Sequence, residues 1–173
     1  MPAPQRTSLE AIVEAGRSVL EEDGPERVTM NAVAERCSVR APSLYKHVKD
    51  RDALLALIAA ATLDELYELL CAEDSLTGLA HAYRSFAHRK PEGFRLLQTR
   101  AAAPEDLARA SRPVLAAAQA AVGKEDALEA ARFMTAWLTG FITMELAGAF
   151  RLGGSLDRAF DYGIERITAA LAR

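Results

Sequence analysis

Apolar residues recur at intervals of three and four along most of this chain, and no useful run of β-branched residues alternates with polar ones. Alternation with a period of two is the pattern of a half-buried strand, whereas intervals of three and four place residues on one face of a helix. The sequence therefore predicts an all-α fold. Glycine, proline and capping residues separate the apolar segments into about nine helices.

The first fifty residues predict three short helices that pack on one another. Thr7 or Ser8 can cap the first helix, which ends at Asp23-Gly24-Pro25. Thr29 can cap the second helix, and a Pro within the first turn suits the third. Ser38 separates these two, which gives a helix-turn-helix. The apolar positions that form their small shared core are Val33, Ala34, Cys37, Val39, Leu44 and Val48.

Positive charge is concentrated in this segment, although the chain as a whole carries a net charge of −3. Between residues 36 and 51 there are five cations and a single acid, Asp50. A local basic patch on an acidic chain is compatible with binding to the phosphates of nucleic acid. The five cations are Arg36, Arg40, Lys46, Lys49 and Arg51.

A helix that enters the major groove of DNA needs small or polar residues at its tip and cations or hydroxyls along its flanks. Residues 40–43, Tyr45 and Lys46 fit this description. Arg40 and Ser43 are candidates for reading bases, and the alternative for Arg40 is a phosphate contact. Asn31 either reaches DNA or is solvated, and His47 either braces the helix or meets a phosphate. The full set of predicted DNA-binding residues is Thr29, Asn31, Arg40, Ala41, Pro42, Ser43, Tyr45, Lys46, His47 and Lys49.

The run SVRAPSLYKHVKDRDALL resembles the recognition helix and the start of the next helix in tetracycline-repressor-type (TetR family) transcription regulators. This resemblance implies that Tyr45 and Lys49 contact phosphates; the alternative for Tyr45 is packing against the first helix. Ser38 stands where the family usually has Gly. A positive φ there costs a serine about 1 kcal/mol, so the turn is expected to be either slightly strained or differently shaped.

Six further helices are predicted after this segment. Asp50 caps the fourth, which runs to about Cys71, and Pro113 either kinks or divides the one that starts at Pro104. Residues 125–150 form the longest apolar helix, which should be buried on nearly all sides. The predicted domains are a helix-turn-helix domain over 1–50 and a helical regulatory domain over 51–173, with the fourth helix as the lever between them.

The second half resembles the regulatory domain of one TetR subgroup, through residues 89–96 and through 140–145 with Gly148 and Phe150 after them. The chain has Thr139 where members of that subgroup often have His, so a role for that imidazole is not carried over. The resemblance implies an effector pocket, although the aromatic residues also suit a plain core. The candidate ligand-binding residues are Tyr83, Phe86, Phe94, Met134, Trp137 and Phe141.

Small residues on the long apolar helix allow another helix to approach closely. They serve either internal packing or a two-fold four-helix interface formed by the last two helices of each subunit. The second interpretation predicts a homodimer that presents two DNA readers to two half-sites. The candidate interface residues are Gly140, Met144, Ala147, Gly148, Phe160, Ile164 and Ile167.

Several other classes of protein find no support in the sequence. It contains no paired carboxylates, Ser-His-Asp order, Gly-rich phosphate loop or compact metal-ligand spacing, so we expect no enzyme, no cofactor and no metal. The longest uncharged stretch, from Phe133 to Met144, is shorter than the roughly 18 residues that cross a membrane. Cys37 and Cys71 suit small buried positions in a reducing cytoplasm. Residues 1–7 resemble a flexible arm and not a signal peptide.

The resulting hypothesis is a cytoplasmic, homodimeric repressor that binds a palindromic DNA operator through residues of about 29–49. A largely apolar small molecule would release it by binding the released state more tightly. The alternatives are an activator, a family member without a small-molecule effector, and a helical protein that uses the same helix pair to bind a protein partner.

Overall fold

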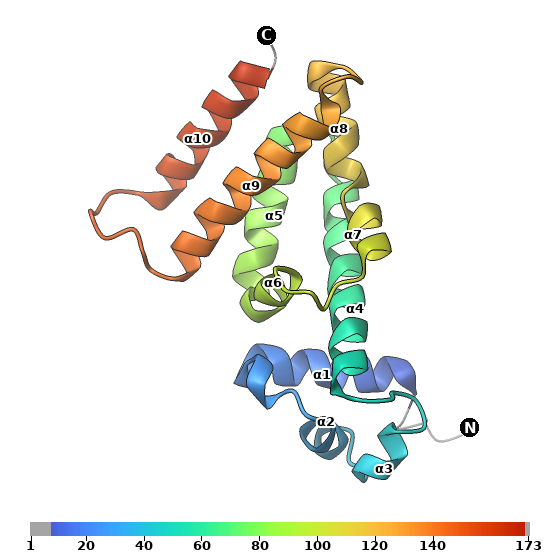
Figure 1. Cartoon of the computed structure of the whole chain (residues 1–173). Helices are drawn as coiled ribbons and strands as arrows, with labels where there is room; N and C mark the ends of the chain where they lie inside the picture. The colour runs from blue at the N-terminus through green and yellow to red at the C-terminus, as the bar shows by residue number, and fades with distance from the viewer. Residues whose placement is uncertain (1–7, 172–173) are drawn as a thin grey trace. The chain divides into compact units, whose positions relative to one another are not determined.

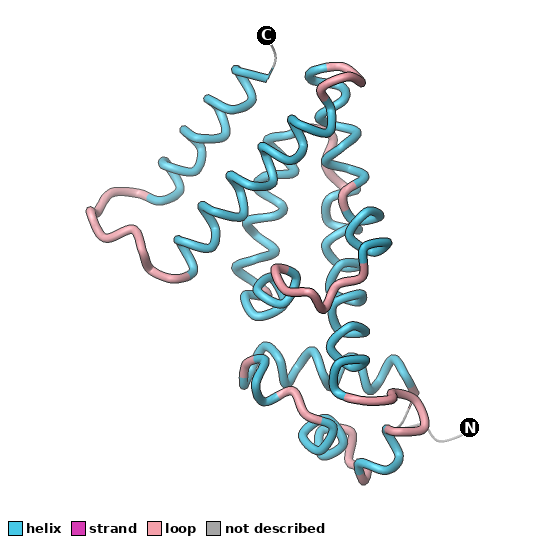
Figure 2. The backbone as a smooth tube through the Cα atoms, viewed as in Figure 1, coloured by secondary structure: helices cyan, strands magenta, loops and turns pink. Residues whose placement is uncertain are grey.

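The computed structural model describes residues 8–171, and that part of the chain consists of α-helices, one short 3₁₀ helix and loops, with no strand (Figures 1 and 2). This confirms the predicted all-α class. The elements are α1 (Leu9–Asp23), the 3₁₀ helix (Pro25–Arg27), α2 (Met30–Arg36), α3 (Ala41–Leu44), α4 (Arg51–Cys71), α5 (Leu76–Arg89), α6 (Pro91–Leu97), α7 (Pro104–Ala110), α8 (Arg112–Val122), α9 (Ala127–Leu146) and α10 (Leu156–Leu171).

The described residues form ten α-helices, where the sequence predicted about nine. The difference arises at Pro113, because the helix that starts at Pro104 is divided and not kinked. Proline has no N–H to donate and clashes with the preceding turn of a helix, but it is tolerated at a helix start. Pro113 accordingly lies in the first turn of α8, directly after the break at Ser111.

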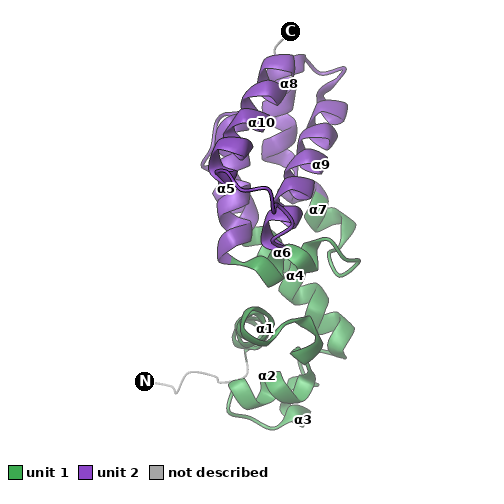
Figure 3. Ribbon diagram, turned by 90° about the vertical axis from the view of Figure 1, so that its left-hand side faces the viewer, with its two compact units in different colours: residues 1–65, 90–107 green, residues 66–89, 108–173 purple. Residues whose placement is uncertain are grey.

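The helices group into two compact units (Figure 3). The N-terminal unit comprises residues 1–65 and 90–107, and the C-terminal unit comprises residues 66–89 and 108–173. α4 contributes residues to both units, since the division falls between Glu65 and Leu66. The predicted arm, residues 1–7, lies outside the described residues.

Side-chain caps place the starts of the first helices where the sequence predicted them. The Ser8 hydroxyl accepts a hydrogen bond from the Ala11 amide at 3.1 Å, which selects Ser8 over Thr7 as the cap of α1. Thr29 accepts from the Ala32 amide at 3.1 Å, and the Asp50 carboxylate accepts from the Ala53 amide at 2.8 Å. Each cap satisfies an amide that the helix itself leaves unpaired.

The core of the N-terminal unit is formed by aliphatic side chains from α1, α2, α3 and α4 and from the segments that join them. Gly16 in α1 allows α4 to come close, because a Cβ at this position would lie 2.6 Å from Cδ1 of Ile58. The fully or almost fully buried members of this core are Ile12, Val19, Leu20, Val28, Val33, Ala34, Leu44, Val48, Leu54 and Ile58.

The longest apolar helix is shorter than predicted, because α9 ends at Leu146 and not near Phe150. Gly148 has a φ of 63° and its amide bonds the Glu145 carbonyl at 2.9 Å, while the Ala149 amide bonds the Met144 carbonyl at 2.9 Å. This pair of bonds, with a left-handed glycine, is the Schellman motif that terminates helices. Gly148 is thus a helix stop.

The prediction that this helix is buried on nearly all sides is wrong for the single chain. One face of α9 is buried, through Ala127, Ala130, Met134, Leu138 and Ile142. Beside that face Phe133 is 53% exposed and Met144 is 46% exposed. An apolar face of this kind is characteristic of a surface that another molecule covers.

The prediction of two buried cysteines holds only in part. Cys37 is half-buried, and its thiol lies 3.8 Å from the Ala11 carbonyl oxygen. Burial raises the pKa of the Cys37 thiol. Cys71 is exposed instead, because it is the last residue of α4. Within residues 8–171 no helix has the combined length and apolar character that crossing a membrane requires.

Candidate nucleic-acid interface

The turn between α2 and α3 is built around Ser38, whose φ is 56°. The Ser38 amide donates to the Glu35 carbonyl at 2.9 Å, and the Val39 amide donates to the Ala34 carbonyl at 2.9 Å. These two bonds form a Schellman motif in which Ser38 takes the left-handed position that favours glycine. The serine therefore has the positive φ that the resemblance predicted, and it is the only non-glycine residue between 8 and 171 that does.

This strain gives a direct prediction for Ser38→Gly. We expect the substitution to raise the free energy of unfolding by up to about 1 kcal/mol, because glycine adopts a positive φ without a Cβ clash. Thermal denaturation should show a midpoint about 2–4 °C higher. As a control, Ser43→Gly lies in α3 and should lower the midpoint. A Ser38→Gly midpoint at or below that of the wild type would contradict the strain at this turn.

The candidate recognition helix, α3, has only four residues and is fixed by two buried side chains. Leu44 is 0% exposed and Val48 is 2% exposed, so both point into the core. After Leu44 the backbone continues as a turn, with the His47 and Val48 amides bonded to the Leu44 carbonyl at 2.8 and 2.9 Å. The side chains between these two anchors, Tyr45, Lys46 and His47, are all exposed.

The structure separates the five clustered cations into two kinds. Arg36 forms a two-point ion pair with Glu22, at 2.9 and 2.6 Å, and this pair lowers the pKa of Glu22. Arg51 donates to the backbone carbonyls of Val28 and Pro25, each at 2.7 Å. Both guanidinium groups therefore already serve the fold. Sequence reasoning did not detect this, because their partners are distant in the sequence.

The other three cations remain available to a ligand. In the described part of the chain Arg40 and Lys46 are exposed and have no ion-pair partner. Lys49 has a side chain that is 89% exposed and lies 3.9 Å from the Asp50 carboxylate, a distance at which exposed pairs contribute little. The free positive charge thus flanks α3, with Arg40 directly before the helix and Lys46 and Lys49 after it.

All ten predicted DNA-binding residues belong to the N-terminal unit, between the start of α2 and the start of α4. Ala41 and Ser43 are half-buried. Thr29 caps α2 with its hydroxyl and is exposed. The remaining residues are exposed, namely Asn31, Arg40, Pro42, Tyr45, Lys46, His47 and Lys49. This arrangement presents hydroxyls, a phenol and cations on one short segment.

The predicted ligand-binding residues are divided between the two units. Phe94 lies in the N-terminal unit, where it is buried, and the other five lie in the C-terminal unit. Phe86 and Met134 are fully buried. The ring of Trp137 lies 5.4 Å from that of Phe141, between ring centres. The hydroxyl groups of Tyr83 and Thr139 lie 3.3 Å apart.

Sequence reasoning missed an ion network in the C-terminal unit that is centred on Arg84. Its guanidinium binds Glu145 through Nε at 2.9 Å and through a second nitrogen, and it also lies 2.8 Å from Asp157. His88 lies 3.1 Å from the same Glu145 carboxylate. The hydrogen bonds from Arg84, followed by those from His88, lower the pKa of Glu145. The network joins α5, α9 and α10.

The dimer candidates also separate into two groups. Gly140, Met144, Ala147 and Gly148 are exposed. Phe160, Ile164 and Ile167 are 0%, 1% and 8% exposed, because α10 turns them toward its own chain. Phe160 lies 4.7 Å below the Arg84 guanidinium and contacts the rings of Trp137 and Phe141. These three side chains are therefore already covered within one subunit.

Comparison with known proteins agrees with this geometry. Residues 12–58 match the family "Bacterial regulatory proteins, tetR family", and residues 76–167 match "Tetracyclin repressor-like, C-terminal domain". An uncharacterized helix-turn-helix transcriptional regulator of Mycobacterium tuberculosis is 28% identical, over 98% of this chain and 84% of that protein. The tetracycline repressor class D of Escherichia coli is 29% identical over 52% of this chain and 39% of that repressor.

Two solved structures show the same fold. A TetR variant from Acinetobacter baumannii AYE, in complex with minocycline, has a TM-score of 0.73 at 22% identity and covers 94% of this chain and 95% of that one. Apo ActR from Streptomyces coelicolor has a TM-score of 0.74 at 18% identity, with 98% and 97% covered. At these identities the likeness concerns the fold.

The exposed, cation-bearing helix-turn-helix, together with the match of residues 12–58, defines a DNA-binding regulator. The two family matches together cover most of residues 12–167, and the chain belongs to the TetR family of transcriptional regulators. This family is one of regulators and not of enzymes.

Proposed function

We propose that this chain represses transcription as a homodimer, binding a palindromic operator through residues 29–49 and leaving it when a small molecule binds the C-terminal unit. The observation that carries the proposal is the division of the cations around α3. Arg36 and Arg51 are held by internal partners, whereas Arg40, Lys46 and Lys49 are exposed on the segment that Leu44 and Val48 anchor. The DNA partner would place this regulator in the bacterial cytoplasm.

The exposed cations and the phenol of Tyr45 have distinct roles in this proposal. Tyr45 and Lys49 grip phosphates, which fixes the position of the helix without reading sequence. Arg40 occupies the N-cap position of α3 without a side-chain capping bond, and its guanidinium would bind the two acceptors of guanine in the major groove. Thr29 and Asn31, at the start of α2, add contacts to the DNA backbone. The small Ala41, Pro42 and Ser43 allow close approach.

A gel-shift series on an operator selected from random DNA tests these roles. Tyr45→Phe and Lys49→Ala should weaken binding to all operators about equally, and Lys49→Ala should reduce the dependence of log affinity on log salt by about one unit. Arg40→Ala should also change the preferred sequence. Arg36→Ala removes the same charge from a residue already paired with Glu22, so it serves as the control with little loss. Undiminished binding by all three variants would refute the assignment.

Dimerisation would use the exposed face of α9, with Gly140, Met144 and Ala147, packed against the same face of a second copy. Phe160, Ile164 and Ile167 are already buried within one subunit, so the proposed interface does not use them as direct contacts. A two-fold axis presents the same patch from both copies and gives one DNA reader for each half-site. Sedimentation of the purified chain measures whether this dimer forms.

The proposed effector is a largely apolar small molecule. The support is that the C-terminal unit carries several aromatic residues on two helices. They are Tyr83 and Phe86 on α5 and Trp137 and Phe141 on α9, which also carries Met134. The A. baumannii TetR variant that shares this fold was solved in complex with minocycline. A screen for compounds that release the selected operator tests this part, and repression in their absence separates a repressor from an activator.

A further inference from the structure

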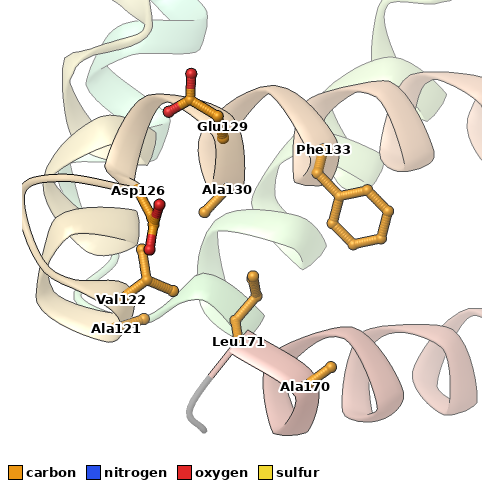
Figure 4. A pocket seen from close by; sticks show the side chains of 8 residues that line it. All are labelled: Ala121, Val122, Asp126, Glu129, Ala130, Phe133, Ala170 and Leu171. Carbon is orange, nitrogen blue, oxygen red and sulfur yellow. The ribbon is translucent and has the colours of Figure 1, made fainter.

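One end of the pair formed by α9 and α10 carries a depression of about 670 Å³ (Figure 4). Its walls are mostly small or aliphatic, and the carboxylates of Asp126 and Glu129 stand beside it. Phe133, which is 53% exposed, forms another part of the wall. The lining residues are Ala121, Val122, Asp126, Glu129, Ala130, Phe133, Ala170 and Leu171. The site thus suits an aliphatic side chain next to a cation.

A segment with that chemistry lies at the opposite end of the same helix pair, in the loop of residues 147–155. Leu152 is fully exposed, and Arg151 before it is exposed and has no ion-pair partner within residues 8–171. The base of the loop is fixed, because the ring of Phe150 lies 5.0 Å from that of Phe141. The loop is thus anchored at Phe150, while the neighbouring Arg151 and Leu152 are open to solvent.

The loop lies far from the depression of its own chain. α9 and α10 run antiparallel, since Phe141 contacts Phe160 and Trp137 contacts Gly163. The loop joins the C-terminal end of α9 to the N-terminal end of α10, whereas the depression lies at the other two ends. The 20 residues of α9 separate these positions by about 30 Å.

A second copy of the chain removes this separation. A two-fold axis perpendicular to the helix pair reverses its direction, so the loop end of one copy lies beside the depression end of the other. The charges are complementary, with Arg151 on the loop and the carboxylates of Asp126 and Glu129 at the depression. Glu129 also lies 3.9 Å from Arg132, but both side chains are exposed, and exposed pairs at this distance contribute little. In a two-fold dimer the loop of each copy meets the depression of the other, so every contact between them occurs twice.

We propose that Arg151 and Leu152 of each subunit dock into the depression of its partner, with the leucine against the aliphatic wall and the guanidinium against Asp126 and Glu129. This inference rests on the proposed homodimer and adds the contact that fixes its register. The loop has two more left-handed glycines, Gly153 and Gly154, directly after the leucine. These glycines allow the chain to reverse direction directly after Arg151 and Leu152.

Disulfide capture tests the contact in the full chain. Leu152→Cys and Ala170→Cys, combined in a Cys37→Ala, Cys71→Ser background, should give a covalent dimer on a non-reducing gel after mild oxidation. Each single-cysteine variant should remain uncrosslinked, because the two-fold axis places the two equivalent cysteines at opposite ends. A solution dimer that gives no cross-link with the double variant would overturn the docking and leave the homodimer standing. A chain that sediments as a monomer would overturn both.

A charge exchange gives a second readout that does not need cysteines. Arg151→Glu should raise the dissociation constant of the dimer about tenfold in sedimentation, and Glu129→Arg with Asp126→Arg should do the same. Combining the three should recover most of the lost affinity, because the opposite charges face one another again. Arg100→Glu, an equal change of charge at an exposed position of the N-terminal unit, is the control. No recovery in the combined variant would refute the pairing.

Discussion

Glu145→Ala is expected to lower the free energy of unfolding of the C-terminal unit by about 3–5 kcal/mol, which is the cost of removing one partner from a buried ion pair. The Glu145 side chain is 7% exposed and that of Arg84 is 13% exposed. Without the carboxylate, the ion pair of Arg84 that remains within residues 8–171 is the one with Asp157, whose side chain is 83% exposed. His88 loses its acceptor as well.

The single tryptophan of the chain allows this loss to be measured directly. Trp137 lies 5.7 Å from Phe160, between ring centres, and Phe160 packs against Arg84, so its fluorescence reports on the affected region during urea unfolding. Asp157→Ala is the matched control, because it removes a carboxylate from the same guanidinium at an exposed site. It should cost about 0–1 kcal/mol. Equal losses for the two variants would contradict the central role of Glu145.

The same carboxylate predicts a dependence of stability on pH. Arg84 and His88 hold the pKa of Glu145 below its ordinary value near 4.5 in the folded chain. The unfolded chain therefore takes up this proton first as the pH falls. The contribution of Glu145 is fully present above pH 4.5 and is lost as the pH falls through the lowered folded pKa. The stability difference between the wild type and Glu145→Gln should accordingly shrink below that pH in urea titrations.

Leu44→Ala is expected to have the second large effect, a loss of about 2–5 kcal/mol within the N-terminal unit together with loss of operator binding. Leu44 is 0% exposed and is the last residue of a four-residue helix, which has too few hydrogen bonds to persist without its anchor. Dimerisation should remain, because the proposed interface belongs to the other unit. Circular dichroism in urea and sedimentation measure the two properties separately.

Tyr45→Ala is the matched control for Leu44, one residue further along the chain. Tyr45 is 56% exposed, so its removal should leave unfolding almost unchanged while weakening binding to DNA. The two neighbouring substitutions thus separate the stability of the helix from its contacts. If Tyr45→Ala destabilised the unit as much as Leu44→Ala does, then Tyr45 would be part of the core, as the alternative interpretation held.

Local signals in the sequence predicted the helices and their starts well. Thr29 and Asp50 act as caps because a side-chain oxygen three residues before an amide is a local arrangement, readable without any knowledge of the fold. The positive φ of Ser38 was also predictable, since the turn fixes it. The end of α9 was missed because the residues after Gly148 are apolar and appeared to continue the helix.

Interactions between distant residues were beyond the reach of the sequence. Glu22 and Arg36 are fourteen residues apart, and Arg84 and Glu145 are sixty-one apart. Neither pair therefore produces a periodic pattern of residues in the sequence. Charge clustering therefore overestimated the free cations near α3. Likewise, the spacing of Phe160, Ile164 and Ile167 identifies an apolar face of α10 but not the partner of that face, which proves to be the same chain.

The two hydrogen bonds from Arg51 have a mechanical consequence for regulation. Its guanidinium holds the carbonyls of Pro25 and Val28, just before α2, to the first turn of α4, and Gly16 lets α1 lie tightly against Ile58 of the same helix. These contacts join the first turns of α4 firmly to α1 and to the segment before α2. A rotation of the first turns of α4 would therefore rotate the helix-turn-helix domain as a rigid body. In the proposed homodimer we therefore expect the proposed effector to change the spacing of the two helix-turn-helix domains without unfolding them.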